Sequence, residues 1–155
     1  MNFMKKTIGL ASDHTGYELK EIIKSHLSKR GFQYVDFGAF NAERSDYPDF
    51  AHKLCQAIER HEIETGIALC GTGNGMAITC NRYKNIRAGL AWNTDIAKLI
   101  SAHNKAHILI IPARFVSKDE IIPIVDAFFD TPFEGGRHLV RINKIFTCPN
   151  GHVKR

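Results

Sequence analysis

Five short apolar runs alternate along this chain with longer amphipathic segments, and that alternation restricts the folds available to it. The runs have the length of β-strands and cover residues 7–11, 33–37, 67–70, 87–91 and 108–111. Because each run is followed by a segment with helical spacing, we expect parallel strands with helices on both faces of the sheet. The sequence therefore predicts an α/β fold: a three-layer, doubly wound, Rossmann-like sheet of five parallel strands.

The amphipathic segments place their apolar side chains on one helical face. They cover residues 19–27, 50–58, 94–102 and 118–129, and another helix is expected from about residue 76. Ser117 and Glu120 have the spacing of a capping box in front of the helix at 118–129. From about residue 132 the pattern becomes less regular and predicts a C-terminal helical extension through Ile145. We expect residues 1–155 to form a single domain that includes this extension.

The composition is that of an ordinary soluble globular protein, with 155 residues, 44% hydrophobic and 24% charged. No apolar run approaches the length of a membrane span, and the first residues lack a signal-peptide pattern. The net charge of +5 comes from scattered basic residues, which argues against nucleic acid as a partner. Four cysteines follow no disulfide spacing, so we expect reduced thiols and a cytoplasmic protein. They are Cys55, Cys70, Cys80 and Cys148.

The stretch from Cys70 to Gly75, Cys-Gly-Thr-Gly-Asn-Gly, is the strongest indication of chemistry. Its alternate glycines follow a predicted strand and let backbone N–H groups approach an anion closely. A thiol at the edge of such a loop, near a helix N-terminus, is expected to have a pKa below its usual value of about 8.5. Cys70 would then act as a nucleophile or general base; the alternative is a small buried core residue. Cys55 and Cys80 fall inside predicted helices, where packing is the better interpretation.

Polar residues follow the other predicted strands, and the carboxyl ends of parallel strands form the edge where ligands bind. Asp13 and His14 follow the first strand, and Arg114 follows the fifth. Asp13 or Thr15 is also suited to cap the next helix, whereas His14 suits phosphate binding or proton transfer. We expect these strand ends to converge near Cys70.

His103 and Asn104 follow the helix predicted at 94–102. His103 is four residues from His107, the spacing of a metal pair on a helix, but His107 is expected to begin a strand. We therefore predict no metal site. A solvated histidine at a helix end is the alternative for His103. Cys148 and His152 supply only two ligands and are interpreted as part of a tail.

Arg137 and Arg141 are four residues apart in the C-terminal extension, with His138 beside Arg137. On a helix the two guanidinium groups share one face, where they suit bidentate binding of a phosphate. The alternative is a solvated basic face.

The order and spacing of these motifs resemble the type B ribose-5-phosphate isomerases and the related galactose-6-phosphate isomerase subunits. The resemblance extends from about Lys6 to about Ile145. Several motifs in one order carry more weight than a single glycine loop. The matching segments are residues 12–16, 44–48, 70–75, 86–88, 103–104 and 134–138, together with Arg141.

The resemblance implies that the protein interconverts a phosphorylated aldose and ketose through an enediolate, with no metal or organic cofactor. It implies that Cys70 moves the proton between C1 and C2, while the amides of residues 71–75, with Thr72, hold the enediolate. His103 is implied to open the furanose ring as an acid, and Asp13 to manage protons on the sugar oxygens.

The resemblance also implies a wider set of substrate contacts. The phosphate ligands would be His14, Arg114, Arg137 and Arg141. The other contacts, besides Asp13 and Thr72, would be Tyr47, Gly71, Gly73, Asn74, Gly75, Asn104 and His138. Family members are homodimers or homotetramers, so some phosphate ligands are expected from a neighbouring subunit. We expect His103 and the arginines to join Cys70 and Asp13 at the carboxyl edge of the sheet.

The leading prediction is interconversion of ribose 5-phosphate and ribulose 5-phosphate, a reaction of the pentose phosphate pathway. The alternative is a hexose 6-phosphate isomerase acting on allose or galactose 6-phosphate, because pocket depth separates the two sugar sizes. A non-catalytic sugar-phosphate sensor is less favoured, since Cys70, His103 and Asp13 are all present. Departures from the usual family pattern bear on substrate choice; they are Asn74, Met76, Cys80, Trp92 and Asn93.

Overall fold

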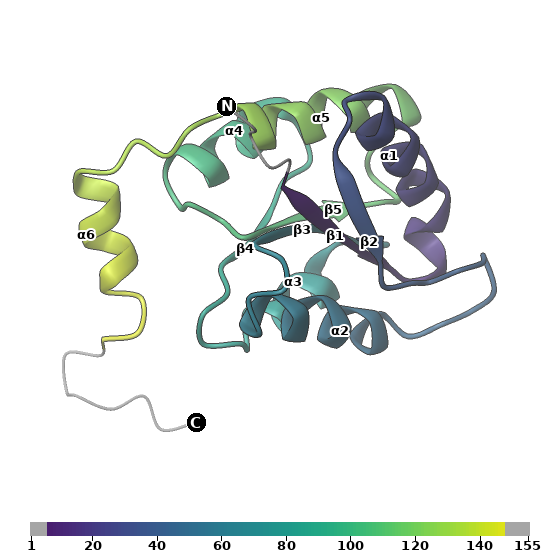
Figure 1. The fold of residues 1–155 in the computed structure, drawn as a ribbon, viewed down its shortest axis with the longest axis horizontal. Helices are drawn as coiled ribbons and strands as arrows, with labels where there is room; N and C mark the ends of the chain where they lie inside the picture. The colour runs from purple at the N-terminus through teal and green to yellow at the C-terminus, as the bar shows by residue number, and fades with distance from the viewer. Residues whose placement is uncertain (1–5, 148–155) are drawn as a thin grey trace.

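The computed structural model describes residues 6–147, in which five strands form one sheet (Figure 1). The strands are β1 (Thr7–Ser12), β2 (Gln33–Asp36), β3 (Thr65–Cys70), β4 (Ala88–Leu90) and β5 (Ile108–Pro112). Their order is β2-β1-β3-β5-β4, and every neighbouring pair is parallel. The predicted five-stranded parallel sheet is confirmed.

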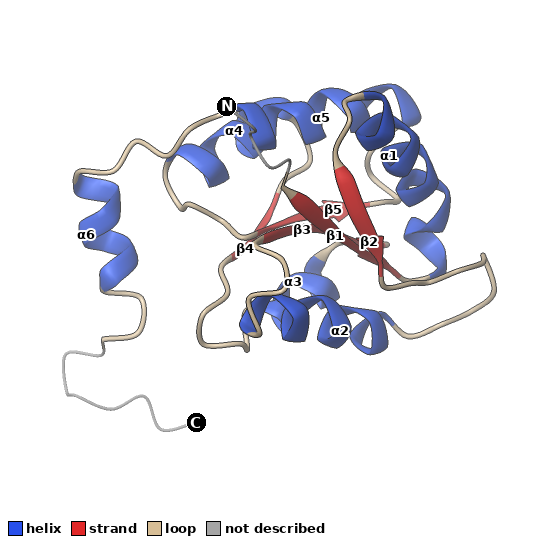
Figure 2. Ribbon diagram, in the orientation of Figure 1, coloured by secondary structure: helices blue, strands red, loops and turns tan. Residues whose placement is uncertain are grey.

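Helices cover both faces of the sheet, which gives the three predicted layers (Figure 2). One face carries α1 (Tyr17–Lys29), α4 (Thr94–Ala102) and α5 (Lys118–Asp130), and the other carries α2 (Tyr47–Glu59) and α3 (Asn74–Cys80). The predicted capping box begins α5: Ser117 Oγ accepts a hydrogen bond from Glu120 N, and Ser117 N donates to Glu120 Oε2 over 2.8 Å. This pairing satisfies two amides at the start of the helix.

The apolar core forms two clusters, one on each side of the sheet. Alternate residues of β3 supply both: Ile67 and Leu69 pack with α1, α4 and α5, while Ala68 and Cys70 pack with α2 and α3. Because both faces are buried, the strands read as continuous apolar runs. Cys55 and Cys80 are fully buried in the second cluster, as their packing interpretation requires.

The chain continues from the neighbouring strands β1 and β3 into helices on opposite faces of the sheet. After β1 it enters α1 on one face, and after β3 it enters α3 on the other. This is the switch point at which open α/β sheets bind ligands. Ser12 is in register with Leu69, so Asp13, which follows β1, lies level with Cys70, the last residue of β3.

The last helix, α6 (Arg137–Asn143), stands apart from the sheet and from the helices that cover it (Figure 1). The segment before it is tied to the end of α4 by a hydrogen bond of 3.0 Å from Glu134 N to Ala102 O. The predicted extension is therefore helical, although its helix ends at Asn143 and not at Ile145. Cys148 and His152 lie outside the described residues. None of the helices within residues 6–147 has the length and hydropathy needed to cross a membrane.

Candidate active site

Cys70 is the last residue of β3, and its thiol faces the turn into α3. The side chain is only 4% exposed. The backbone amides of Gly73, Gly75 and Met76 donate hydrogen bonds to its sulfur. Gly73 makes this turn with φ of 76°, a left-handed conformation in which a Cβ would also lie 2.4 Å from Leu90 Cδ1. The glycine loop thus wraps its amides around the sulfur.

The predicted lowering of the pKa of Cys70 is wrong in direction. Burial raises the pKa of this thiol, and the hydrogen bonds from the loop amides offset the increase only in part. The negative charge of Asp13 raises the pKa further. The sequence revealed the amides but not the depth at which the sulfur lies. Once the thiolate forms, it has three N–H donors, and two of them belong to the loop expected to hold an enediolate.

Asp13 and His14 follow β1 and lie at the same edge as Cys70. Asp13 is 6% exposed, and its Oδ1 accepts a hydrogen bond of 2.9 Å from Thr15 N. It thereby caps the short 3-10 helix His14–Gly16, as expected of one of the two capping candidates. The amide and the carbonyl oxygen of Ser45 both lie 3.2 Å from His14 Nδ1, so Nε2 remains for a ligand.

Tyr47 and Arg114 border the glycine loop from either side. A Cβ built on Gly75 would lie 2.4 Å from Tyr47 Cζ, so the tyrosine ring occupies the space that glycine leaves. Arg114 N donates to Gly71 O over 3.0 Å, and a guanidinium nitrogen would lie 3.4 Å from a Cβ on Gly71. Thr72 and Asn74 are exposed at the tip of the loop. The structure therefore brings together every predicted residue of the loop with Asp13, Tyr47 and Arg114.

His103 and Asn104 lie at the opposite edge of the sheet. Arg87 precedes β4, and its Nε donates to Asn104 O over 3.0 Å. Cys70, in contrast, is in register with the last residue of β5. The five residues of β5 separate the two edges by about 13 Å, at roughly 3.3 Å per residue. The expectation that His103 and the C-terminal arginines join Cys70 is therefore wrong within one chain. The reason is topological: α4 runs back along the sheet, so its C-terminal end returns to the amino ends of the strands.

His103 instead meets His138, the second residue of α6. Their imidazole rings stack face to face, with centroids 4.1 Å apart and planes 10° from parallel. His138 is buried, and its Nε2 has no hydrogen-bond partner. Glu134 Oε2 lies 3.3 Å from His138 Nε2 and 3.9 Å from His103 Nε2. The acid candidate is thus held between a second imidazole and a carboxylate.

Within residues 6–147, one group of side chains brings its ligand atoms close enough together for a metal ion: His103, Glu134 and His138. Two features disfavour a cation. Rings that stack face to face point their nitrogen lone pairs side by side, whereas a metal needs them to converge. Burial lowers the pKa of His138, and the charges of His103, Arg137 and Arg141 lower it further against the opposing charge of Glu134, so two nearby arginines would repel a cation here. His107 does not belong to this group; it directly precedes β5, and its Nδ1 accepts the amide of Arg87 over 3.0 Å.

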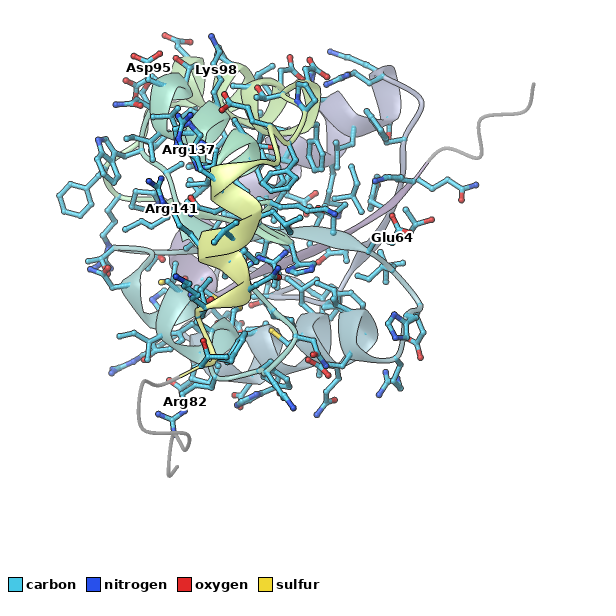
Figure 3. The ribbon with its side chains drawn as sticks, turned by 90° about the vertical axis from the view of Figure 1, so that its left-hand side faces the viewer. Glu64, Arg82, Asp95, Lys98, Arg137 and Arg141 are labelled. Carbon is cyan, nitrogen blue, oxygen red and sulfur yellow. The ribbon has the colours of Figure 1, made fainter. Side chains whose placement is uncertain are left out.

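Arg137 and Arg141 project from the same side of α6 (Figure 3). A cavity of about 290 Å³ lies where α6 meets the end of α4. It is lined by His103, Asn104, His138, Arg141, Ile142 and Ile145. Two guanidinium groups at this spacing are suited to a phosphate. A larger cavity, of about 800 Å³, lies near Lys6 and Thr65 and contains none of the predicted site residues.

Two residues of these sites had no role in the sequence prediction. Ser45 holds His14, and Glu134 faces both stacked histidines. Both fall in motifs that carried the family resemblance, at 44–48 and 134–138, and that position was the only signal available. The contacts of Ser45 with His14 and of Glu134 with His103 do not follow from spacing, because each joins segments far apart in the chain, whereas Glu134 lies only four residues before His138.

The chain matches known proteins over nearly its whole length. Residues 8–145 match the family model described as Ribose/Galactose Isomerase. Ribose-5-phosphate isomerase B of Escherichia coli is 37% identical over 140 residues, which are 90% of this chain and 94% of that protein. The crystal structure of a ribose 5-phosphate isomerase from Thermotoga maritima has a TM-score of 0.87 and 47% identity, and the match covers 90% of this chain and 97% of that one.

A further solved structure was determined with a sugar phosphate. It is ribose-5-phosphate isomerase B from Mycoplasma genitalium with bound ribulose-5-phosphate, with a TM-score of 0.85 and 41% identity. The match covers 90% of this chain and 93% of that one. Sequence and fold thus agree over most of this chain and of each relative, and the chain belongs to the ribose/galactose isomerase family.

Proposed function

We propose that this chain interconverts ribose 5-phosphate and ribulose 5-phosphate through an enediolate, with Cys70 as the base. The observation that carries the proposal is the sulfur of Cys70, which accepts hydrogen bonds from the backbone amides of Gly73, Gly75 and Met76 beside the buried carboxylate of Asp13. Proton transfer between adjacent carbons needs a base next to fixed donors for negative charge. The relative with bound ribulose-5-phosphate supports the choice of sugar.

The reaction begins with opening of the furanose ring. His103 donates a proton to the ring oxygen while the hydroxyl on C1 loses one to water, which leaves the aldehyde. The Cys70 thiolate then removes the proton from C2, and the electron pair moves through the new C1–C2 double bond to O1. Asp13 carries the proton of the C2 hydroxyl to O1, and Cys70 returns its proton to C1, which yields the ketose. Cys70 and Asp13 are restored at the end, and His103 regains its proton from water.

We further propose that two copies of the chain share each site, one supplying Cys70 and Asp13 and the other His103, Arg137 and Arg141. Their separation across the sheet supports this arrangement, because one substrate cannot span both edges. So do α6 and the residues that follow it, because the helix stands off the sheet and this segment exposes apolar side chains. Those side chains, with 43% to 54% exposure, are Leu139, Val140, Ile145 and Phe146.

Mixing two inactive variants tests the shared site. Cys70→Ala and His103→Ala are each expected to abolish most turnover of ribose 5-phosphate. If sites are shared, refolding the two together restores activity, because mixed dimers have one site with both residues intact. Random pairing gives about a quarter of the wild-type sites. A mixture that stays inactive, while each variant is folded and dimeric, would refute sharing.

An activity panel tests the sugar. The protein is treated with a chelator, and kcat/KM is compared for ribose, allose and galactose phosphates. We expect ribose 5-phosphate to be the best substrate and the chelator to have no effect. Activity confined to a hexose 6-phosphate would replace this proposal by the hexose alternative. Tight binding without turnover of any of them would indicate a sugar-phosphate sensor.

We propose the cytoplasm as the site of action. Among residues 6–147, Cys55, Cys70 and Cys80 are all buried free thiols, which supports a reducing compartment. Fractionation with an antibody to the chain would test this, and recovery from an oxidising compartment would contradict it.

A further inference from the structure

Lys20, in the second turn of α1, is the one lysine that is buried among residues 6–147, with 0% exposure. A buried ammonium is costly unless its protons are all engaged. Its Nζ donates to Asp36 Oδ1 and to the carbonyl oxygen of Ala39, each over 2.6 Å. The rings of Tyr17 and Phe40 lie within 6 Å of it, at 5.7 Å and 5.6 Å. Every partner but Tyr17 belongs to the segment 36–40, which begins with Asp36, the last residue of β2.

That segment is joined to the end of β1. Ser12 N donates to Gly38 O, and Ala39 N donates to Ser12 O, each over 2.6 Å. Asp36 Oδ1 also accepts the amide of Gly38 over 2.9 Å. Lys20 therefore holds the turn from both ends, through Asp36 and through Ala39. Ser12, which makes both of these backbone hydrogen bonds with the turn, directly precedes Asp13.

The same segment leads to the second contact at this edge. From Phe40 the chain continues to Ser45, whose hydroxyl accepts the amide of His14 over 3.1 Å. Both strand-end residues that face the substrate thus depend on a loop whose start is fixed by one buried ammonium. The apolar core alone does not fix this loop, since residues 40–44 are exposed.

Lys24 provides an internal comparison. Its Nζ lies 3.1 Å from Asp36 Oδ2 and 2.8 Å from Glu21 Oε1, so it pairs with the same carboxylate as Lys20. Its side chain is 22% exposed, and it makes no hydrogen bond to Ala39 among those of the described residues. A change at Lys24 removes charge from Asp36 but leaves the backbone hydrogen bonds with Ser12 in place.

We propose that Lys20 is a positioning residue for the isomerase reaction: by fixing residues 36–39 against the end of β1, it sets Asp13 beside Cys70 and His14 at the substrate edge. The assignment rests on the function proposed above. It is distinguished from a purely structural role by the readouts below, because removing one partner of a buried ion pair can by itself lower stability. Lys20→Met keeps the length of the side chain, and Asp36 retains its contact with Lys24.

The titration of Cys70 reports on Asp13 without any substrate. The charge of Asp13 raises the pKa of Cys70, so moving the carboxylate away lowers the pKa of that thiol. The other groups that border the glycine loop, Arg114 and Tyr47, make none of the contacts of Lys20, and neither is among the main causes that shift the pKa of Cys70. A shift on changing Lys20 therefore reports on the end of β1.

The experiment compares Lys20→Met with Lys24→Met and the wild type. We expect Lys20→Met to lower kcat for ribose 5-phosphate by roughly 10- to 100-fold, as small misplacements of reacting groups do. Lys24→Met should stay within about twofold of wild type, like other partly exposed substitutions. In parallel, the 13Cβ shift of labelled Cys70 is followed against pH, and the pKa of this thiol should fall in Lys20→Met alone.

Two outcomes overturn the proposal. One is a Lys20→Met enzyme with the kcat of Lys24→Met; the other is a lowered kcat with an unchanged Cys70 titration, which means a structural role only. If Lys20→Met does not fold, Lys20→Gln, which keeps a shorter N–H donor, is judged by the same two readouts. A wild-type protein inactive on ribose 5-phosphate would refute the proposed function, while the Cys70 titration would still test the positioning by Lys20.

Discussion

The imidazole of His138 lies flat against that of His103, with ring centroids 4.1 Å apart. The two residues belong to α6 and to the end of α4, so this stack joins the outlying helix to the body of the protein. The backbone hydrogen bond from Glu134 to Ala102 and the approach of Glu134 Oε2 to His103 Nε2 join the same two parts. Its loss should affect both the acid candidate and the arginines of α6.

We expect His138→Ala to raise KM and lower kcat together. KM rises because α6 no longer holds Arg137 and Arg141 in place, and kcat falls because His103 loses the ring that fixes its orientation. A change of roughly 10-fold or more in kcat/KM is expected from such misplacement. The control is Lys98→Ala, an exposed change on α4. Equal kinetics in the two variants would contradict this account.

Gly75→Ala should damage the site through Tyr47. The added Cβ would lie 2.4 Å from the tyrosine ring, which must move or the loop must shift. Overpacking of this kind costs about 1–3 kcal/mol, so Tm and kcat/KM should both fall. Gly71→Ala is the matched control, since its Cβ would approach only the flexible Arg114 side chain, at 3.4 Å. If both variants have the Tm of wild type, the close packing against Tyr47 is not a constraint.

Activity should rise with pH through the neutral range. The thiolate of Cys70 is the active base, and burial raises the pKa of this thiol, so only a small fraction is ionised at pH 7. The rising limb of kcat/KM should therefore have its midpoint above the usual thiol value of about 8.5. Steady-state kinetics from pH 6 upward measure it. A profile that is already flat at pH 7 would mean that substrate binding reverses the effect of burial or that another base acts.

Folding stability should fall in mild acid because of His107. Burial is the main cause that lowers the pKa of His107 from 6.5 to about 4, and Arg87 N donates to its Nδ1. Between these values the unfolded chain binds a proton that the folded chain does not, so stability is lost as pH falls from 6.5 towards 4. The loss is at most about 3 kcal/mol, at 1.36 kcal/mol per pKa unit.

Urea unfolding at a series of pH values tests this prediction. His107→Gln should be less stable at neutral pH and should lose less stability on acidification than the wild type. His61→Asn, a change at an exposed histidine with φ of 58°, is the control and should keep the wild-type slope. Parallel slopes for wild type and His107→Gln would refute the assignment.

The sequence was sufficient for the layers of the fold and for one half of the site. Apolar periodicity located all five strands, and the rule that parallel strands end at one edge brought Asp13, Cys70 and Arg114 together. The insertion of β5 between β3 and β4 has no local signal, because strand order depends on how crossovers pack. The same limit applies to His103, whose edge is decided by the direction in which α4 runs.

The sequence also did not predict how deeply Cys70 and Lys20 are buried or which residues Lys20 contacts. The spacing of the residues does not indicate how deeply Cys70 is buried. Burial raises the pKa of its thiol more than the hydrogen bonds from three backbone amides lower it. Lys20 looks like any polar position of an amphipathic helix, yet it is fully buried because Asp36 and Ala39 meet it from another segment. Such contacts join residues 16 to 19 positions apart, and periodicity describes only one element at a time.

The length of α4 determines where His103 lies and which way its imidazole points. The helix begins at the cap made by Asn93, whose side chain accepts the amide of Ile96, and His103 follows its last residue. One residue added or removed would turn His103 by about 100° around the helix axis and shift it by about 1.5 Å. The imidazole would then point away from His138 and Glu134 with no change in its chemistry. The number of residues from Asn93 to His103 is therefore as important for the proposed acid role of His103 as the imidazole itself.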